Sequence, residues 1–210
     1  MVKVKICGIT NLKDARQALE SGASFIGFNF YKLSPRYISP SAARRILQRL
    51  PKNIKSVGVF VNESEVRMLA VARRIGLDYL QLHGEESPAT VARLKRTLPV
   101  IKAIRVRDSF STRQLSSYKH ATAFLLDGFD RRRHGGSGKT FRWDIARRAK
   151  GAGRIFLAGG LTPDNIGAAI RSAKPYAVDV CSGVEAKPGK KDPALLKDFM
   201  RAVRETQKTI

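Results

Sequence analysis

Short apolar segments alternate with longer amphipathic segments along the whole chain. The first of them, Val2–Cys7, alternates valine or isoleucine with lysine or cysteine. This period of two residues is typical of a strand whose two faces have different surroundings. Seven more segments are short and apolar, and each predicts a strand. They are Phe25–Phe30, Ser56–Val61, Tyr79–Leu82, Val100–Val106, Ala123–Asp127, Ile155–Ala158 and Ala177–Cys181.

The segments between these strands carry the signals of helices. We expect Asn11 to cap a helix over Leu12–Ser21, which stops at Gly22, because asparagine favours the N-cap and glycine the end of a helix. Asn62 is predicted to cap the helix that ends at Ile75. Further helices are expected over Ser41–Leu50, from Ser87-Pro88, over Thr112–Tyr118, through Ala146–Lys150, from Thr162-Pro163-Asp164 and over Pro193–Arg204.

The repeating strand–helix rhythm predicts an α/β protein with a parallel sheet. Eight such units suit a single closed (β/α)₈ barrel, although 210 residues is at the small end for that fold. No linker or shift in composition divides the chain, so we expect one domain over residues 1–210. A doubly wound open sheet stays possible, because periodicity does not prove that a sheet closes.

Composition and net charge indicate in which compartment the protein works and which classes of ligand it favours. The chain holds two cysteines and no apolar stretch long enough for a membrane span or a signal peptide, so a soluble, cytoplasmic protein with no membrane partner is expected. Its net charge of +23 favours phosphorylated or carboxylated ligands. The same charge has an alternative interpretation, which is a basic nucleic-acid-binding protein on a barrel scaffold. The aromatic residues lie in apolar strands and the basic residues are scattered over the helices, which argues against specific binding of nucleic acid.

In a barrel, the chemistry belongs at the carboxyl ends of the strands and in the loops beyond them. Nearly every predicted strand is followed there by a polar residue or glycine. These residues are Cys7, Asn29, Asn62, His83, Arg105 or Arg107, Asp127, Gly159-Gly160 and Ser182-Gly183. For general acid–base chemistry the candidates are Cys7 and Asp127, which the strand order places on opposite sides of the mouth. The competing interpretations are a buried structural cysteine and a carboxylate in a helix cap or salt bridge.

Two glycine-containing turns are candidate phosphate sites. Gly159-Gly160 follows the seventh strand and Ser182-Gly183 the eighth, and barrels often bind phosphate with these two loops. The segment Gly135–Thr140 is not a P-loop, because Arg133 occupies the position where that motif requires glycine. A mobile loop that closes over a small substrate is expected there instead. No histidine or cysteine pair has zinc-site spacing, so no metal is expected.

These residues, taken together and in order, resemble the phosphoribosylanthranilate isomerase family. The matching segments span the whole chain. They are Lys5-Ile6-Cys7-Gly8-Ile9-Thr10, Gly27–Phe30, Ser34-Pro35-Arg36-Tyr37, Gly58–Asn62, Gln81-Leu82-His83-Gly84, Leu126-Asp127, Gly135–Phe141 with Trp143, Ala158–Asn165 and Asp179–Glu185.

The resemblance implies an isomerase of tryptophan biosynthesis that needs no cofactor. Its substrate would be N-(5-phosphoribosyl)anthranilate, a small phosphorylated molecule, which an Amadori rearrangement converts into carboxyphenylamino-deoxyribulose 5-phosphate. Cys7 would be the general base and Asp127 the general acid. Arg36 would bind the carboxylate. His83 and Asp179 would join the binding site, and Gly159, Gly160, Ser182 and Gly183 would hold the phosphate. The enzyme would be a monomer or a homodimer.

Individual residues add to this resemblance, depart from it or extend the interpretation of the first strand. A histidine-pathway-like sugar isomerase would carry aspartate at the position of Cys7, which argues against that alternative. Cys181 stands where serine or another small residue is more usual, and Arg142 where an acidic residue is. Strand alternation also places Lys5 on the face of Cys7, so we expect Lys5 to pair with Asp179 if the first and eighth strands adjoin.

Overall fold

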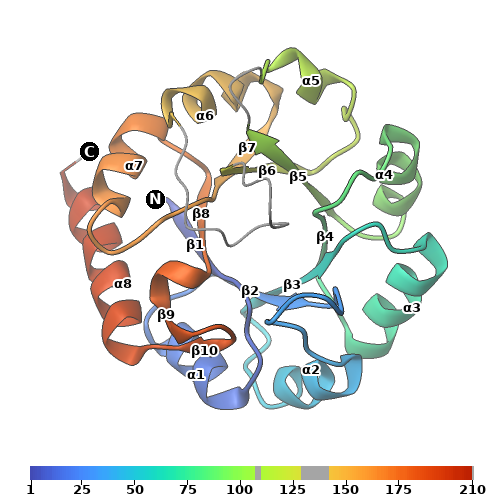
Figure 1. Ribbon diagram of the computed structural model, residues 1–210, viewed down its shortest axis with the longest axis horizontal. Coiled ribbons are helices and arrows are strands. Elements are labelled where there is room, and N and C mark those ends of the chain that lie inside the picture. Colours follow the sequence, from blue (N-terminus) through green and yellow to red (C-terminus); the bar gives the residue numbers. More distant parts are fainter. Residues whose placement is uncertain (107–109, 129–141, 210) are drawn as a thin grey trace.

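The computed structural model describes residues 1–106, 110–128 and 142–209. Within these residues, eight parallel strands form a closed barrel in sequence order, with helices around the outside (Figure 1). The strands are β1 Lys3–Ile6, β2 Phe25–Asn29, β3 Lys55–Phe60, β4 Tyr79–Leu82, β5 Val100–Val106, β6 Ala123–Gly128, β7 Arg154–Leu157 and β8 Ala177–Val180. Since β1 pairs with both β2 and β8, the predicted barrel is confirmed and the open sheet is excluded.

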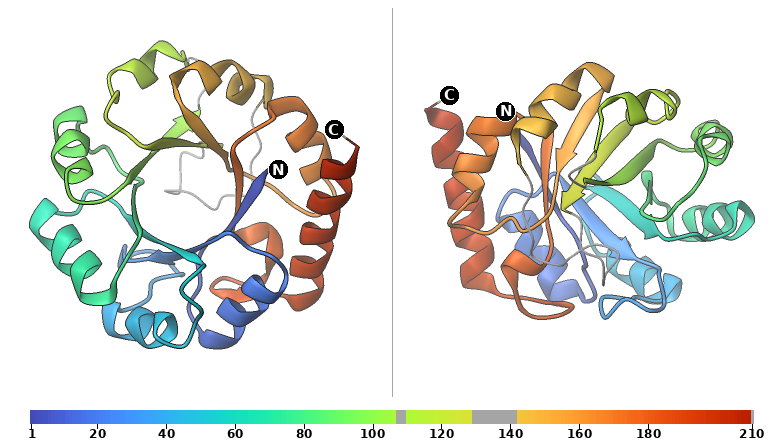
Figure 2. Two further views of the ribbon diagram at one scale, coloured as in Figure 1. Left: turned by 180° about the vertical axis from the view of Figure 1, so that it is seen from behind. Right: turned by 45° about the horizontal axis from the view of Figure 1, so that its top comes forward.

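Helices follow the strands and surround the barrel in each view of Figure 2. They are α1 Leu12–Glu20, α2 Pro40–Leu47, α3 Glu65–Ile75, α4 Pro88–Lys95, α5 Arg113–Ser116, α6 Asp144–Arg148, α7 Ile166–Ala173 and α8 Pro193–Lys208, with two 3₁₀ helices, η1 Ala149–Ala152 and η2 Ser182–Val184. Within the described ranges, no helix has the length and apolar character needed to cross a membrane.

The alternation along the strands separates two buried layers. One set of side chains fills the barrel interior and includes Phe25, Val57, Leu125 and Phe156. The opposite faces of the same strands pack against the helices in a larger apolar cluster. Polar side chains that point inward toward the carboxyl ends of the strands are therefore surrounded by barrel wall, which is where the candidate site lies.

Most predicted elements are present, but several boundaries differ. The Asn11 cap of α1 is confirmed, because its side chain accepts a hydrogen bond from the Asp14 amide at 2.9 Å. The predicted Asn62 cap is wrong: Asn62 has a left-handed φ of 50°, and Ser64 caps α3 instead. Helix α7 begins at Ile166, because residues 163–165 form a turn first. The loop expected to close over the substrate lies outside the described residues.

One element was not expected from the sequence. After η2 the chain forms a short antiparallel hairpin, β9 Glu185–Lys187 and β10 Lys190–Lys191, which lies beside α1 in Figure 1. The hairpin is tied to the first strand–helix unit, since the Lys191 amide donates to Asp14 Oδ2 at 2.8 Å and the Thr10 hydroxyl donates to the Gly189 carbonyl at 2.5 Å. This attachment brings Glu185 and Lys191 next to the mouth of the barrel.

Candidate active site

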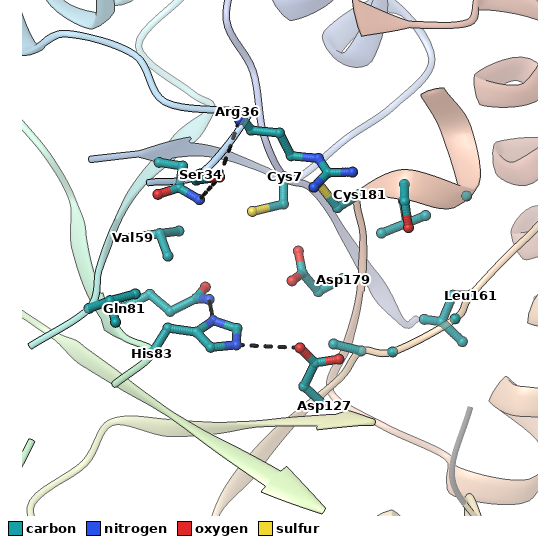
Figure 3. A pocket seen from close by; sticks show the side chains of 18 residues that line it. Cys7, Ser34, Arg36, Val59, Gln81, His83, Asp127, Leu161, Asp179 and Cys181 are labelled. Carbon is teal, nitrogen blue, oxygen red and sulfur yellow. Dashed lines mark hydrogen bonds and ion pairs between the residues drawn. The ribbon is translucent and has the colours of Figure 1, made fainter. Parts of the chain in front are cut away.

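A pocket at the carboxyl end of the barrel collects the residues predicted to form the site (Figure 3). All nine lie in its lining: Cys7, Arg36, His83, Asp127, Gly159, Gly160, Asp179, Ser182 and Gly183. Asn29 also lines it, whereas Asn62 and Arg105 do not. Arg107 is outside the described residues. The barrel thus brings together residues that are up to 176 positions apart in the chain, from Cys7 to Gly183.

Below Cys7, the predicted contact between Lys5 and Asp179 is confirmed. Strands β1 and β8 pair these residues directly, and Lys5 Nζ donates to Asp179 Oδ1 at 2.8 Å. Burial, the largest effect, raises the pKa of Asp179 to about 6 against the opposing charge of Lys5. Burial alone would lower the pKa of Lys5, but the negative charges of Asp179 and Cys7 outweigh it and raise that pKa. Lys5 is therefore a permanent cation under the pocket.

The Cys7 thiol lies in surroundings that favour its thiolate. Its pKa is held well below the ordinary value, first by a hydrogen bond from Cys181 and then, against the opposing effect of burial, by the charge of Lys5. The same hydrogen bond raises the pKa of Cys181, so the proton stays on that thiol. Gly27 keeps this corner open, because a Cβ on it would lie 2.8 Å from Cys7 Sγ and 3.0 Å from Lys5 Nζ. Cys7 can therefore act as a base.

On the far side of the pocket, Asp127 lies beside His83 and Gln81. The His83 Nε2 atom is 3.3 Å from Asp127 Oδ2, and His83 Nδ1 is 2.9 Å from the side-chain nitrogen of Gln81. Asp127 and His83 are both nearly fully buried. Gln81 was not predicted, although a polar residue at an inward position of an otherwise apolar strand is a signal that could have identified it.

The loop that carries His83 is anchored by buried charges that sequence reasoning did not find. Lys102, which is 1% exposed, donates to the carbonyls of Leu82 and Gly84 at 3.3 and 2.7 Å and to Glu86 Oε2 at 2.8 Å. The Asn62 side chain reaches the same loop and accepts from the Glu85 amide at 2.6 Å. Both residues hold the backbone around His83 and so help to fix its ring beside Asp127.

The two candidate phosphate loops pack closely against each other. Gly159 and Gly160 have φ values of 86° and 61°, a conformation that residues other than glycine rarely adopt. A Cβ on Gly183 would collide with the Leu161 carbonyl, so the loop after β8 approaches the loop after β7 more closely than a side chain would allow. Both loops therefore present backbone to the pocket, as anion-binding turns do.

Arg36 enters the pocket from the loop after β2, where its amide donates to the Ser34 hydroxyl at 3.2 Å. Its guanidinium is bound by Glu185 of the β9–β10 hairpin, with Nη2 2.7 Å from Oε2. Glu185 belongs to a motif that the sequence analysis recognised without assigning it a role. Within the described ranges, no group of three His, Cys, Asp or Glu residues is arranged to hold a metal ion.

The chain is similar to known proteins in both sequence and structure. A family model described as N-(5′phosphoribosyl)anthranilate (PRA) isomerase matches residues 4–202. The N-(5′-phosphoribosyl)anthranilate isomerase of Pelobacter propionicus is 52% identical over 207 residues, which are 99% of this chain and 98% of that protein. The crystal structure of phosphoribosyl anthranilate isomerase from Thermotoga maritima superposes with a TM-score of 0.92 at 45% identity, covering 98% of this chain and 100% of that one.

A further similar structure contains a ligand. It is a phosphoribosyl anthranilate isomerase in complex with reduced 1-(o-carboxyphenylamino)-1-deoxyribulose 5-phosphate, with a TM-score of 0.87 and 42% identity over 98% of this chain and 100% of that one. The family match covers residues 4–202, and the Pelobacter propionicus protein is 52% identical over nearly the full length of both chains. The chain therefore belongs to the N-(5′-phosphoribosyl)anthranilate isomerase family.

Proposed function

We propose that this chain isomerises N-(5′-phosphoribosyl)anthranilate in tryptophan biosynthesis, with Asp127 as general acid and Cys7 as general base. The observation that carries these roles is that the two side chains line one pocket from β6 and β1 (Figure 3). A substrate lying between them can receive a proton on one side and lose one on the other. The family match leaves a nucleic-acid-binding function and a histidine-pathway-like isomerase without support.

In the first step, Asp127 protonates the furanose ring oxygen, and the C1′–O bond breaks. The nitrogen lone pair forms a Schiff base with C1′ as the ring opens. His83 supports this role by its position: its buried Nε2 has no hydrogen-bond partner in the described part of the chain and lies 3.3 Å from Asp127 Oδ2, so a small turn of the ring would let an N–H there stabilise the carboxylate that remains after proton transfer. The barrel wall around Asp127 keeps bulk water away from the transfer.

In the second step, Cys7 removes the proton from C2′, and the electron pair moves through C1′ to the nitrogen. The product of this step is an enolamine, which tautomerises to the ketone. Thiolate at Cys7 is required here, and the cation of Lys5 together with the Cys181 thiol supports it. Neither step oxidises or reduces the substrate, so the chain's own acid and base suffice.

Binding uses the two charged ends of the substrate. Arg36 would take the anthranilate carboxylate, and the turns at Gly159-Gly160 and Ser182-Gly183 would take the phosphate. The related structure that holds a reduced carboxyphenylamino-deoxyribulose 5-phosphate supports a phosphorylated ligand here. The net charge of +23 would attract a molecule that carries both a phosphate and a carboxylate and raise its encounter rate at low salt.

We also propose an oligomeric state and a location in the cell for this chain. A similar structure comes from a protein described as dimeric phosphoribosylanthranilate isomerase of Thermotoga maritima, which supports a monomer or a homodimer for this chain. Light scattering across a concentration series distinguishes the two. The biosynthetic role supports a cytoplasmic enzyme, which cell fractionation tests.

The decisive experiment is turnover of phosphoribosylanthranilate by the wild type, Cys7→Ser and Asp127→Asn. Each substitution removes one proton-transfer group with little change in shape, so we expect kcat to fall by about 10²- to 10⁴-fold. Asp198→Asn, on the outer helix α8, is the matched control and should retain activity. Binding of the reduced product analogue by each variant shows that the pocket is intact. Full activity of either site variant would refute its role.

A further inference from the structure

The guanidinium of Arg36 is held along one edge by Glu185. Nε lies 3.0 Å from both carboxylate oxygens of Glu185, and Nη2 lies 2.7 Å from Oε2. The two side chains are 10% and 3% exposed, so water competes little for either partner. This arrangement fixes the plane of the guanidinium before any ligand arrives.

The held edge determines which edge of Arg36 faces the pocket. A guanidinium can bind one carboxylate through Nε and Nη2 and a second through Nη1 and Nη2. Glu185 occupies the first edge, and within the described part of the chain Nη1 donates to no protein acceptor. Because Arg36 lines the pocket, the second edge is the one offered to a ligand carboxylate.

Lys191 changes the charge of this arrangement. Its ammonium is fully buried and donates to Glu185 Oε1 at 3.1 Å and to the Cys181 carbonyl at 3.1 Å. Burial works against ionisation of Glu185, but the hydrogen bond from Arg36 and the charge of Lys191 lower its pKa, so it remains a carboxylate. One carboxylate between two cations leaves one positive charge. Without Lys191, Glu185 would cancel the charge that Arg36 offers to an anion.

We propose that Glu185 and Lys191 are positioning residues for the aromatic carboxylate of the substrate. Glu185 fixes the orientation of Arg36, and Lys191 restores the positive charge that Glu185 would otherwise remove. Neither residue touches the substrate. This role rests on the proposed function of Arg36. It makes recognition of the carboxylate depend on the β9–β10 hairpin, since Glu185 lies 149 residues after Arg36 in the chain.

The test compares two ligands by calorimetry: reduced 1-(o-carboxyphenylamino)-1-deoxyribulose 5-phosphate and the same compound without its ring carboxylate. In Glu185→Gln, Arg36 must be ordered by the ligand, so affinity for the carboxylated ligand should fall about tenfold. Affinity for the other ligand should change less than about twofold. Lys191→Met should show the same selective loss, and Lys191→Arg, which keeps the charge, should restore selectivity.

The chain offers a matched control on its surface. Glu65 binds Arg93 through the same Nε and Nη2 edge, at 3.0 and 2.6 Å, between α3 and α4. Glu65→Gln breaks an equivalent fork away from the pocket and should leave the affinities for both ligands unchanged. In steady-state kinetics, Glu185→Gln should raise KM by a larger factor than it lowers kcat, because Glu185 contacts the carboxylate-binding Arg36 directly but reaches the base Cys7 only through Cys181, whose Sγ is 3.7 Å from Glu185 Oε1.

The outcomes separate the inference from the function on which it rests. If the wild type binds both ligands equally, the role of Arg36 fails. If the wild type discriminates and Glu185→Gln weakens both ligands equally, Glu185 is only structural and the positioning role is overturned. Unchanged binding overturns it as well. Should Glu185→Gln fail to fold, Glu185→Asp keeps the charge but withdraws the carboxylate by one methylene, and it should show the same selective loss.

Discussion

Lys5 Nζ and Asp179 Oδ1 are 2.8 Å apart on the paired strands β1 and β8, and both side chains are almost completely buried. The pair lies beneath Cys7, so it is part of the electrostatic surroundings of the reacting groups. Buried ion pairs contribute little to stability relative to apolar residues, yet removal of one partner leaves an uncompensated charge. Protonation of Asp179 or loss of Lys5 should therefore change both the free energy of unfolding and the rate of the reaction.

Replacing Lys5 by methionine tests this coupling. At pH 8 the carboxylate of Asp179 loses its partner, and we expect the free energy of unfolding to fall by about 3–5 kcal/mol. At pH 5 the loss should be smaller, because Asp179 can take up a proton. The rate should fall about tenfold or more, since the Cys7 thiolate loses its nearest cation.

The measurements are urea unfolding at both pH values and turnover. Lys55→Met is the control: its ion pair with Asp78 is 3.0 Å long but exposed to water, so its loss should change the free energy of unfolding far less than the loss of the buried pair does. Unchanged stability and rate in Lys5→Met would show that the buried pair has no role.

A second prediction concerns Asp179 itself. Its pKa is raised by burial from 3.8 to about 6, so the folded protein holds this proton to higher pH than the unfolded chain does. Stability from this group is fully present below pH 3.8 and is lost as the pH rises through 6. At roughly 1.4 kcal/mol per pKa unit, the loss amounts to about 3 kcal/mol.

Asp179→Asn removes this titration, so its stability relative to the wild type should increase by about 3 kcal/mol between pH 4 and pH 7. Denaturant unfolding over that range measures the difference, which cancels the groups that titrate equally in both proteins. The asparagine variant should at the same time lose activity, because Asp179 lines the pocket and its carboxylate orients Lys5 beneath Cys7. A difference that stays constant with pH would show that the pKa of Asp179 is not raised.

The pair also shows what the sequence can predict. Alternation in Val2–Cys7 and Ala177–Cys181 assigns Lys5 and Asp179 to inward positions, and barrel closure then makes them neighbours. The catalytic candidates follow from the same rule, because parallel strands end at one rim. Local pattern and strand order suffice for these residues.

Other parts of the site depend on contacts that pattern does not encode. The hairpin strands of Glu185 and Lys191 have three and two residues, too short for periodicity to mark them. Lys102 resembles a surface lysine in sequence, yet it is buried by Glu86 and two carbonyls. Asn62 has a good capping side chain, but its left-handed backbone directs that side chain to the next loop. Each depends on tertiary structure.

A third prediction assigns the ionisation of Cys7 to Cys181. The hydrogen bond between the two thiols is the largest effect that lowers the pKa of Cys7. Cys181→Ala removes the donor, so the pH midpoint of Cys7 alkylation by iodoacetamide should rise. Below neutral pH the alkylation rate should fall about threefold to tenfold, the range of one hydrogen bond. Mass spectrometry identifies the modified cysteine.

Cys181→Ser is the conservative control, because a hydroxyl still donates to the thiolate. It should keep the midpoint near that of the wild type. If alanine and serine at this position have the same alkylation profile, the hydrogen bond does not set the ionisation of Cys7.

The same neighbouring thiols predict sensitivity to hydroperoxides. Cys7 thiolate attacks the peroxide oxygen to give a sulfenic acid and release hydroxide or an alcohol, and the Cys181 thiol then displaces water to form a disulfide. The register allows the bond: Ile6 pairs with Val180, the Cys7 amide donates to the Val180 carbonyl at 2.9 Å, and adjacent strands are about 4.8 Å apart.

Wild type should therefore lose activity with formation of a Cys7–Cys181 cross-link, which dithiothreitol reverses. In Cys181→Ser no disulfide can form, so prolonged exposure should drive Cys7 to sulfinic acid, and dithiothreitol should recover much less activity. Peptide mapping and recovery of turnover measure both outcomes, and equal loss and equal recovery in the two proteins would exclude a role for Cys181.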